Sequence, residues 1–251
     1  MSSLLLGQIH HVGQDVGFRV MTPDRDLVAV GSDREHVHRR ILDAAQELFV
    51  AEGYRNVSIR KIAEKVEYSP AALYSYFPSK DDLFFALAEE RFRKLFEFTN
   101  EPIATSSDPL TAIRHGFLRY YQFSRQHPEY FELMFVDRSV PKISHEWERF
   151  GFVQQMIEEV CAVIKRGVDE GLFPPDTDPD VAFHILWAAV HGPATVAVCD
   201  RLAPDENPDA LARDTLEAAI AGLRAGIRTT FTPSKCHSQS VTGVPVEKND
   251  A

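Results

Sequence analysis

Apolar residues in the N-terminal part of the chain recur every three to four positions, which is the spacing of one face of an α-helix. The first run extends from Val37 to Phe49 and stops before Gly53, a residue type that commonly ends helices. Ser32 and Glu35 have the spacing of a capping box ahead of this run. The pattern therefore predicts a first helix that begins near Ser32.

Two shorter helices follow, joined by a tight turn. Ser58 is a suitable N-cap for the first of them, whose apolar positions between Ile59 and Val66 form one stripe. Residues 67–69 form the turn, and Pro70 is favoured at the first position of the second helix. Its length is about two turns, because Pro78 ends it. This layout indicates a helix-turn-helix, whose second helix enters the major groove of DNA.

The rest of the chain also has helical periodicity, interrupted by proline, glycine and Asp-Pro signals. The predicted helices cover residues 79–98, 109–126, 128–136, 143–170, 179–199 and 210–227. We therefore expect an all-α fold. Residues 32–80 form a three-helix DNA-binding domain, and residues 81–228 form a helical ligand-binding and dimerisation domain. Residues 1–31 and 229–251 lack a period and are expected to be disordered.

The last two predicted helices suit self-association. The helix over 179–199 is apolar nearly all round, which indicates burial on more than one side. The helix over 210–227 combines an apolar stripe with small residues that allow close approach of a partner. Together with their copies they predict a four-helix bundle in a symmetric dimer.

Aromatic residues are concentrated on two successive helices, 109–126 and 128–136, and Phe accounts for 17 of 251 residues. Aromatic stripes at helical spacing are usually part of an ordinary core. Their succession here leaves a second interpretation open, an apolar cavity that binds a small molecule.

The net charge of −10 is unevenly distributed. Residues 34–80 carry eight Lys or Arg against six Asp or Glu, whereas residues 81–251 carry seventeen against twenty-seven. The slightly basic head can approach phosphates, and DNA should repel the acidic remainder.

Cysteine usage and hydropathy point to the cytoplasm. The three cysteines, Cys161, Cys199 and Cys236, have no pairing logic, which suits a reducing compartment, and the first two are expected in the core. We find no membrane span and no signal peptide, and expect no membrane partner. The pair His10-His11 has no companion ligands and is read as exposed. Met21 is an alternative start, and the sequence alone does not decide whether residues 1–20 belong to the native protein.

No sequence motif indicates an enzyme. The chain has no G-x-S-x-G, P-loop, dinucleotide-binding glycine motif or H-E-x-x-H. His184 and His191 share a helix face with Trp187, but histidines in a core or pocket explain them better than a metal site. We expect no catalytic residues, no cofactor and no metal.

The N-terminal motifs resemble those of the tetracycline-repressor (TetR) family. The shared pattern is I-L-D-A-A-Q-E-L-F-V-A-E-G-Y, then V-S-I-R-K-I-A, then Y-S-P-A-A-L-Y-S-Y-F-P-S-K-D-D-L, within residues 39–83. Two positions depart from it: Glu67 stands where the family usually has the turn glycine, and Ala71 replaces another common glycine. A left-handed backbone at Glu67 would carry strain. The segment L-W-A-A-V-H-G-P resembles family members with a Trp-His-Gly signature, here Trp187, His191 and Gly192.

The residue types divide the DNA-binding head into two roles. Hydroxyl and cationic groups suit phosphate oxygens and set position, and the resemblance implies this role for Lys80 as well; small residues let the helix approach base edges. The candidates for DNA contact are Arg55, Ser58, Arg60, Ser69, Pro70, Ala71, Ala72, Tyr74, Ser75, Tyr76 and Lys80. Tyr76 fits a core position equally well, whereas Leu73 and Phe77 are expected in the core.

The expected function is that of a cytoplasmic, homodimeric transcriptional repressor that a small apolar or aromatic ligand releases from double-stranded operator DNA. The candidates for the ligand cavity are Phe117, Tyr121, Met134, Phe135, Trp147, Trp187 and His191. Two alternatives remain: a DNA-binding architectural factor without a ligand, and a helical carrier or enzyme with a vestigial head. Ligand, operator, regulated genes and the sign of control are beyond the sequence.

Overall fold

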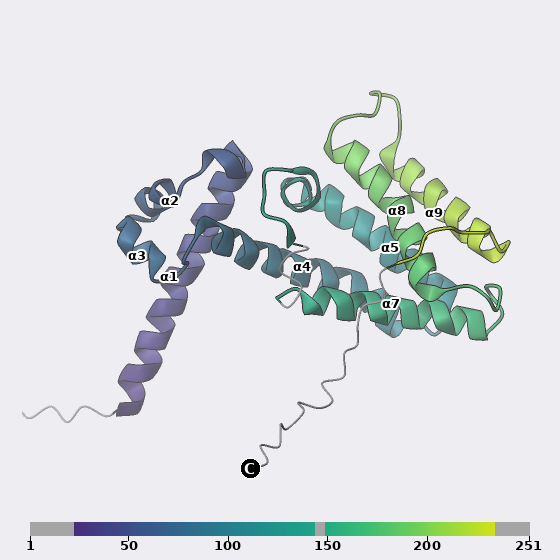
Figure 1. The fold of residues 1–251 in the computed structure, drawn as a ribbon, viewed down its shortest axis with the longest axis horizontal. Helices are drawn as coiled ribbons and strands as arrows, with labels where there is room; N and C mark the ends of the chain where they lie inside the picture. Colours follow the sequence, from purple (N-terminus) through teal and green to yellow (C-terminus); the bar gives the residue numbers. More distant parts are fainter. Residues whose placement is uncertain (1–22, 144–148, 234–251) are drawn as a thin grey trace, which may run out of the picture. The chain divides into compact units, whose positions relative to one another are not determined.

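The computed structural model describes residues 23–143 and 149–233, and within these ranges every regular element is a helix (Figure 1). The all-α fold class is thereby confirmed. The elements are α1 (Pro23–Glu52), the 3₁₀ helix η1 (Tyr54–Asn56), α2 (Ile59–Val66), α3 (Pro70–Tyr74), α4 (Lys80–Thr105), α5 (Pro109–Gln126), α6 (Pro128–Phe131), the π-helix η2 (Glu132–Val136), α7 (Gly151–Asp169), α8 (Pro179–Val198) and α9 (Pro208–Arg224).

Helix α1 starts earlier than the sequence pattern predicts. Its first residue is Pro23, so Ser32 lies inside the helix and does not cap it. Pro at the first helical position and acidic residues in the first turn favour this start, although residues 23–31 have no sustained apolar period. The expectation of disorder is therefore wrong for residues 23–31; residues 1–22 lie outside the described part. The described residues from Ile41 onward form one compact unit, and residues 23–40 belong to another.

The helix-turn-helix has the predicted caps. Ser58 Oγ accepts a hydrogen bond from the Lys61 amide (3.2 Å), and Ser69 Oγ accepts one from the Ala72 amide (3.1 Å). Each hydroxyl thus satisfies a backbone donor that the helix start leaves unpaired. Between the two helices Glu67 has φ 61° and ψ 37°, the left-handed conformation expected where the family has glycine.

Helix α3 is shorter than the two turns predicted. It has five residues, and the amide groups of Tyr76 and Phe77 both bond to the Leu73 carbonyl oxygen in a final tight turn (2.9 Å each). Pro78 disfavours helical backbone at Phe77, so the helix cannot continue beyond this turn.

Helix α4 continues to Thr105, beyond the predicted end near Phe98. Ser79 caps it by accepting a hydrogen bond from the Asp82 amide (3.0 Å). The extension has a packing reason, because Ile103 lies directly over Gly116 of α5, where any Cβ would clash with it. This contact depends on the other helix and cannot be read from the sequence of α4 alone.

Helix α5 has the predicted ends, but the single helix predicted after it is divided into an α-helical part and a π-helical part. Asp108 caps α5 through the Thr111 amide (2.8 Å), and Pro128 begins α6 as expected. After Phe131 the backbone widens into η2, closed by a bond from the Asp137 amide to the Glu132 carbonyl oxygen (2.8 Å). Such π-helical turns are rare and frequently occur at functional sites.

Helix α7 begins at Gly151, not at Ile143 as predicted. Phe150, just before it, is fully buried and packs against Phe92 of α4 (ring centroids 5.9 Å apart). Residues 144–148 lie outside the described part. Cys161 and Cys199, expected in the core, are only half-buried.

Helix α8 contains an internal proline whose missing hydrogen bond is replaced from α9. Pro193 has no N–H for the Ala189 carbonyl oxygen, and Thr215 Oγ1 of α9 lies 2.7 Å from that oxygen. By length and composition α8 is also the one helix in the described ranges that would be apolar enough to cross a membrane. It packs against α5, α7 and α9, as a core helix of a folded bundle does.

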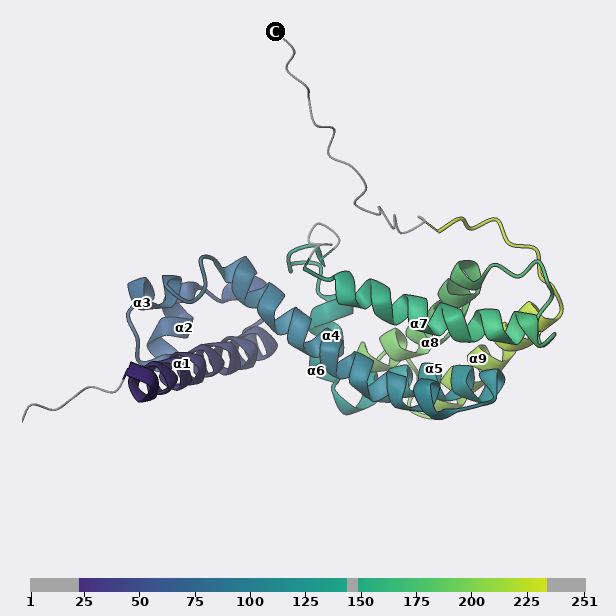
Figure 2. The same ribbon diagram turned by 90° about the horizontal axis from the view of Figure 1, so that it is seen from below.

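The helices around the centre of the bundle run in defined directions (Figures 1 and 2). Asn100 Nδ2 of α4 donates to Glu159 Oε2 of α7 (3.0 Å), and Arg166 of α7 donates to the Ser106 carbonyl oxygen (3.3 Å), so α4 and α7 are parallel. Helix α5 runs opposite to α4, since Arg119 donates to the Phe98 carbonyl oxygen (3.1 Å) while Gly116 faces Ile103.

Candidate functional site

Helix α3 presents small and hydroxyl-bearing side chains to solvent. Ser69, Pro70, Ala71, Tyr74 and Ser75 are exposed, and Ala72 is partly so. Leu73 and Phe77 are buried as expected and hold α3 on the rest of the head. Tyr74 is 52% exposed, which leaves its hydroxyl available to a phosphate, whereas Tyr76 is half-buried.

The serine hydroxyls of this face differ in whether their hydrogen-bond donor or acceptor capacity remains free. Ser58 and Ser69 accept backbone hydrogen bonds as caps, so their O–H groups remain possible donors to phosphate oxygens. Ser75 Oγ instead donates to the Ala72 carbonyl oxygen (2.7 Å). Its proton is engaged within the helix, and its oxygen can still accept from a base edge.

The two arginines predicted to contact DNA are both exposed. Arg60 forms an ion pair with Glu64 on the same helix (3.0 Å), with 81% and 64% of the side chains exposed. An exposed pair of this kind is worth little and can be exchanged for a phosphate. Arg55 is the middle residue of η1 and is also exposed.

Lys80 has a structural role that the sequence does not reveal. Its Nζ donates to the carbonyl oxygens of Tyr54 and Val57 (3.0 Å each) and lies 4.1 Å from the centre of the Tyr54 ring. The Tyr54 hydroxyl in turn donates to Asp81. An ammonium has three N–H groups, so one remains for the predicted phosphate contact.

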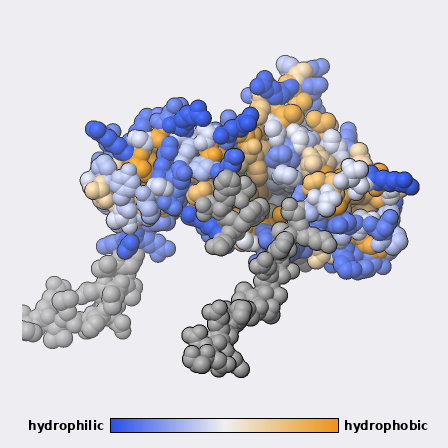
Figure 3. Space-filling view, viewed as in Figure 1, coloured by the Kyte–Doolittle hydropathy of each residue, from blue (hydrophilic) through white to orange (hydrophobic). Residues whose placement is uncertain are grey.

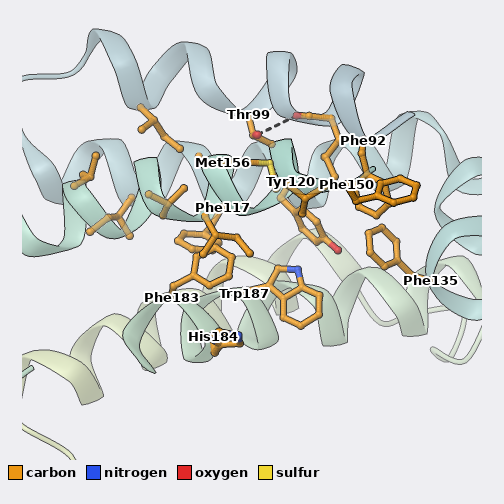
Figure 4. Close-up of a pocket in the computed structure, with 18 of the residues that line it drawn as sticks. Phe92, Thr99, Phe117, Tyr120, Phe135, Phe150, Met156, Phe183, His184 and Trp187 are labelled. Atoms are coloured by element: carbon orange, nitrogen blue, oxygen red, sulfur yellow. Dashed lines mark hydrogen bonds between the residues drawn. The ribbon is translucent and has the colours of Figure 1, made fainter. Parts of the chain in front are cut away.

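A largely apolar cavity of about 290 Å³ lies between α4, α5, α7 and α8 (Figure 4). Phe117, Phe135 and Trp187 line it, as predicted. Tyr121 and Met134 do not: the Tyr121 hydroxyl donates to Asp209 Oδ1 of α9 (2.6 Å), and Met134 lines a separate small void beside Arg91. His191 is outside the lining as well, and Trp147 lies outside the described residues.

Most of the remaining wall comes from residues of α4 and α7 that were not among the predicted cavity candidates. α4 contributes Phe92, Leu95, Thr99 and Ile103, and α7 contributes Val153, Met156, Ile157, Val160 and Val163. Their apolar positions at helical spacing were the available signal. A solvent-excluded core would give the same pattern, so only the three-dimensional arrangement separates the two.

One end of the cavity carries a polar cluster made of Tyr120, His191 and Trp187. The Tyr120 hydroxyl is 2.7 Å from His191 Nδ1, and the Trp187 ring packs on the His191 ring (4.7 Å between centroids). Burial raises the pKa of Tyr120 far above its ordinary value and lowers the pKa of His191. Both groups are therefore neutral at physiological pH, and the cluster offers hydrogen bonds without charge.

A second polar cluster joins α1 to the ligand-binding part. Gln46 Nε2 of α1 donates to the Tyr130 hydroxyl of α6 (2.7 Å), and Arg91 of α4 donates to the Gln46 side-chain oxygen. The Arg91 guanidinium also stacks on the Tyr130 ring (4.0 Å) and is 8% exposed. Its buried Nε has no hydrogen-bond partner among the described residues, so this cluster is imperfectly satisfied.

Two protein families match separate parts of the chain. Residues 41–87 match a family described as "Bacterial regulatory proteins, tetR family", and residues 113–219 match one described as "Tetracyclin repressor-like, C-terminal domain". The first match covers the helix-turn-helix and the start of α4, and the second covers the cavity. Neither description mentions a Trp-His-Gly signature, so that subtype stays a prediction.

Individual proteins show the same relationship at low identity. YuxN of Bacillus subtilis, an uncharacterized HTH-type transcriptional regulator, is 28% identical over 101 residues, which are 40% of this chain and 35% of YuxN. The HTH-type transcriptional repressor AcnR of Corynebacterium glutamicum is 25% identical over 173 residues, 66% of this chain and 84% of AcnR. The solved structure of the regulator FadR from Bacillus subtilis, in complex with stearoyl-CoA, aligns with a TM-score of 0.62 at 17% identity over 73% of this chain and 98% of FadR, which indicates a shared fold.

Proposed function

Because the chain belongs to the tetracycline-repressor (TetR) family of bacterial regulatory proteins, we propose that it is a homodimeric DNA-binding repressor that a small ligand releases from its operator. The observation that carries this proposal is the pairing, in one chain, of an exposed and correctly capped α3 with a largely apolar cavity between α4, α5, α7 and α8. A DNA-binding architectural factor would have no use for the cavity.

The head binds DNA by placing α3 in the major groove. Ser69, Ala71 and Ala72 are small enough to bring the helix close to base edges, where methyl and hydroxyl groups make contacts. Tyr74 and the Ser58 hydroxyl bind phosphates at the groove edges and fix the position of the head. Arg60 leaves Glu64 for a phosphate when DNA is present.

One head makes few base contacts, so tight specific binding needs two. The heads of a dimer would sit about one helical turn apart, roughly 34–36 Å, on a palindromic site. Small residues on the outer faces of α8 and α9 support the predicted interface, because Ala188, Gly192, Ala218, Ala221 and Ala225 are exposed. Figure 3 shows apolar surface around α8 and the loop after it, while hydrophilic surface predominates over α2 and α3.

The cavity reaches the head through a short chain of contacts. Phe135 of η2 forms part of the cavity wall, and its ring packs on Phe131 of α6 (4.8 Å between centroids). Tyr130, the residue before Phe131, accepts a hydrogen bond from Gln46 of α1, and its ring stacks under the guanidinium of Arg91 of α4. A ligand that moves η2 therefore disturbs the polar cluster that joins α1 to the bundle and changes the spacing of paired heads. Such coupling is typically 1–3 kcal/mol and is limited by the ligand's differential affinity for the two states.

The remaining expectations follow from this role. The protein acts on DNA and is therefore placed in the cytoplasm, with α8 as a core helix that packs on three others. We assign it no enzymatic activity.

Footprinting on the DNA upstream of the protein's own coding region tests the proposal. We expect one protected, palindromic site whose half-sites are about 10 base pairs apart, or a multiple of that. Protection of a single half-site, or uniform coating without sequence preference, would contradict a specific dimer. Phe117→Trp should fill the cavity and either mimic or block the ligand, and a variant with unchanged ligand response would remove Phe117 from the site.

A further inference from the structure

We infer that the cavity binds an uncharged, elongated aliphatic molecule with one hydrogen-bonding end, of the class of long-chain alcohols or ketones. This inference rests on the proposed function, since it names the kind of ligand that would release the repressor. The cavity does not suit a ligand whose carboxylate or phosphate group would be held wholly inside it.

The first argument is the shape of the cavity. On α4 its wall extends from Phe92 to Ile103, and at 1.5 Å per residue this distance is about 16 Å. On the parallel helix α7 the wall extends from Val153 to Val163, about 15 Å by the same measure. Tetrahedral angles let each carbon–carbon bond of about 1.5 Å advance an extended chain by only about 1.25 Å, so with a van der Waals radius of about 2 Å at each end a chain of roughly ten carbon atoms matches this length.

The second argument is the difference between the two ends (Figure 4). Near the C-terminal end of α4 the lining includes Ile103, with Ile113 from α5 and Val160 and Val163 from α7, all of them branched aliphatic side chains. At the other end the rings of Phe92, Phe135 and Phe150 pack on one another, and Phe135 also contacts the ring of Tyr120, with Trp187 in the same wall. A molecule with an alkyl tail and one polar end therefore has a single preferred orientation.

The third argument is charge. No Lys, Arg, Asp or Glu is among the described residues that line the cavity. The lining hydroxyl of Thr99 is engaged with the Leu95 and Phe96 carbonyl oxygens (2.9 and 3.2 Å). A buried carboxylate would lose its hydration without gaining a cation, and that loss is unfavourable by several kcal/mol.

The polar end suits a neutral ligand group. The Tyr120 hydroxyl is hydrogen-bonded to His191, whose pKa burial lowers, and neither neutral His191 nor Trp187 carries a charge. A hydroxyl or carbonyl can share in this cluster as donor or acceptor, whereas an ionised group finds no opposite charge. His184, which borders the cavity from α8, is itself bonded through Nδ1 to the Asp180 carbonyl oxygen (2.7 Å).

Gly116 sets the length of the aliphatic end. A Cβ at this position would lie 2.7 Å from Ile103 Cδ1, and that flexible side chain would have to turn into the cavity. Gly116→Ala should therefore shorten the longest chain that binds well by one or two carbon atoms. Gly151→Ala is the matched control, because a Cβ there meets nothing within 4 Å.

The test compares decan-1-ol, decanoic acid and decanoyl-coenzyme A, which share one chain length, by calorimetric titration of the full-length protein at pH 8. We expect the alcohol to bind at least tenfold more tightly than either anionic probe. Equal or tighter binding of the acid would overturn the inference. Tighter binding of the coenzyme A thioester would overturn it in favour of a ligand whose charged part stays outside.

Two variants of neighbouring tyrosines localise the polar end. Tyr120→Phe should weaken decan-1-ol binding about five- to tenfold by removing one hydrogen bond. Tyr121→Phe makes the same change on a side chain that faces Asp209 outside the cavity, and should leave the affinity unchanged. Equal effects of both variants would contradict the assignment, and the wild-type comparison stands even if one variant fails to fold.

A separate DNA titration keeps this inference apart from the proposed function. Protein that binds decan-1-ol selectively but no DNA would support the ligand class and contradict the repressor. Protein that binds its operator but prefers decanoic acid would support the repressor and contradict the ligand class.

Discussion

At the scale of single residues, Glu67 occupies a backbone conformation that suits glycine better. Its φ of 61° places a side chain with a Cβ in the left-handed region, which is unfavourable by roughly 1–2 kcal/mol for most residues. Glu67→Gly removes this strain but gives the unfolded chain more freedom. We expect a net rise of up to about 1 kcal/mol in the free energy of unfolding, measured by urea denaturation.

Glu97→Gly is the control for that experiment. Glu97 is exposed in the right-handed interior of α4, so glycine there should lower the free energy of unfolding by about 1 kcal/mol. A loss of stability in both variants would show that Glu67 is not strained.

Lys80 has a predicted role in DNA contact and an observed role in the stability of the head, and two measurements on one variant distinguish them. Lys80→Ala should weaken binding to all duplexes and lower the slope of log affinity against log salt by about one. It should also destabilise the head, because two hydrogen bonds to the Tyr54 and Val57 carbonyl oxygens disappear. Salt titration and urea denaturation of the same preparation measure both effects. Lower stability with an unchanged salt slope would leave Lys80 a structural role only.

His191 should make stability depend on pH. Burial lowers the pKa of folded His191 below the ordinary value of about 6.5 that it regains on unfolding. Between these two values the unfolded chain binds a proton that the folded chain does not, so stability is lost as the pH falls from about 6.5 towards the folded pKa. Urea denaturation of the wild type and His191→Gln at pH 7.5 and 5.5 isolates this contribution. A stability difference between the two proteins that stays constant with pH would contradict a buried, neutral His191.

At the scale of elements, the polar cluster between α1, α4 and α6 is the step that couples the cavity to the head. Tyr130→Phe removes the hydrogen bond from Gln46 and leaves the ring under Arg91. We expect operator affinity to change little, while the ratio of affinities without and with decan-1-ol falls from the range of 5- to 150-fold to near one. Fluorescence anisotropy of labelled operator measures both. Tyr121→Phe should keep the wild-type ratio, and an equally large ratio in Tyr130→Phe would place the coupling elsewhere.

Most helix starts that a local cap determines were predictable from the sequence; α9 is the exception, because Asn207 caps it at Pro208, two residues before the predicted start. Ser58, Ser69, Ser79, Asp108 and Asp178 all accept hydrogen bonds from backbone amides at the helix starts where the sequence suggested a cap. Features that depend on distant neighbours were not predictable. The extension of α4 follows from Gly116, and the late start of α7 coincides with the burial of Phe150.

The same limit applies to the candidate sites. The exposed face of α3 follows from a short motif, so its residues could be named in advance. The cavity is formed by four helices, and apolar side chains alone do not tell a wall from a filled core. Tyr121 and Met134 lie one helical position away from cavity residues, which was enough to misplace them. Tyr120 went unnamed because its role depends on His191, 71 residues away.

At the scale of the whole molecule, the acidic residues 81–251 and the nearly neutral head both limit non-specific binding to DNA. The net charge of −10 makes non-specific attraction to DNA weak, so affinity must come from α3 and its neighbours rather than from bulk charge. A protein of this kind would leave DNA readily when its heads are misaligned. Ligand binding then needs to supply only a modest free energy to act as a switch.

Fluorescence anisotropy with the footprinted operator tests the central claim, that α3 reads DNA in a paired assembly. At about 150 mM salt we predict a dissociation constant between 10⁻⁸ and 10⁻¹¹ M for the full-length protein, and at least a thousandfold weaker binding to a scrambled duplex. Two protein chains should bind each duplex. Equal affinity for both duplexes, or a complex with one chain, would contradict the account.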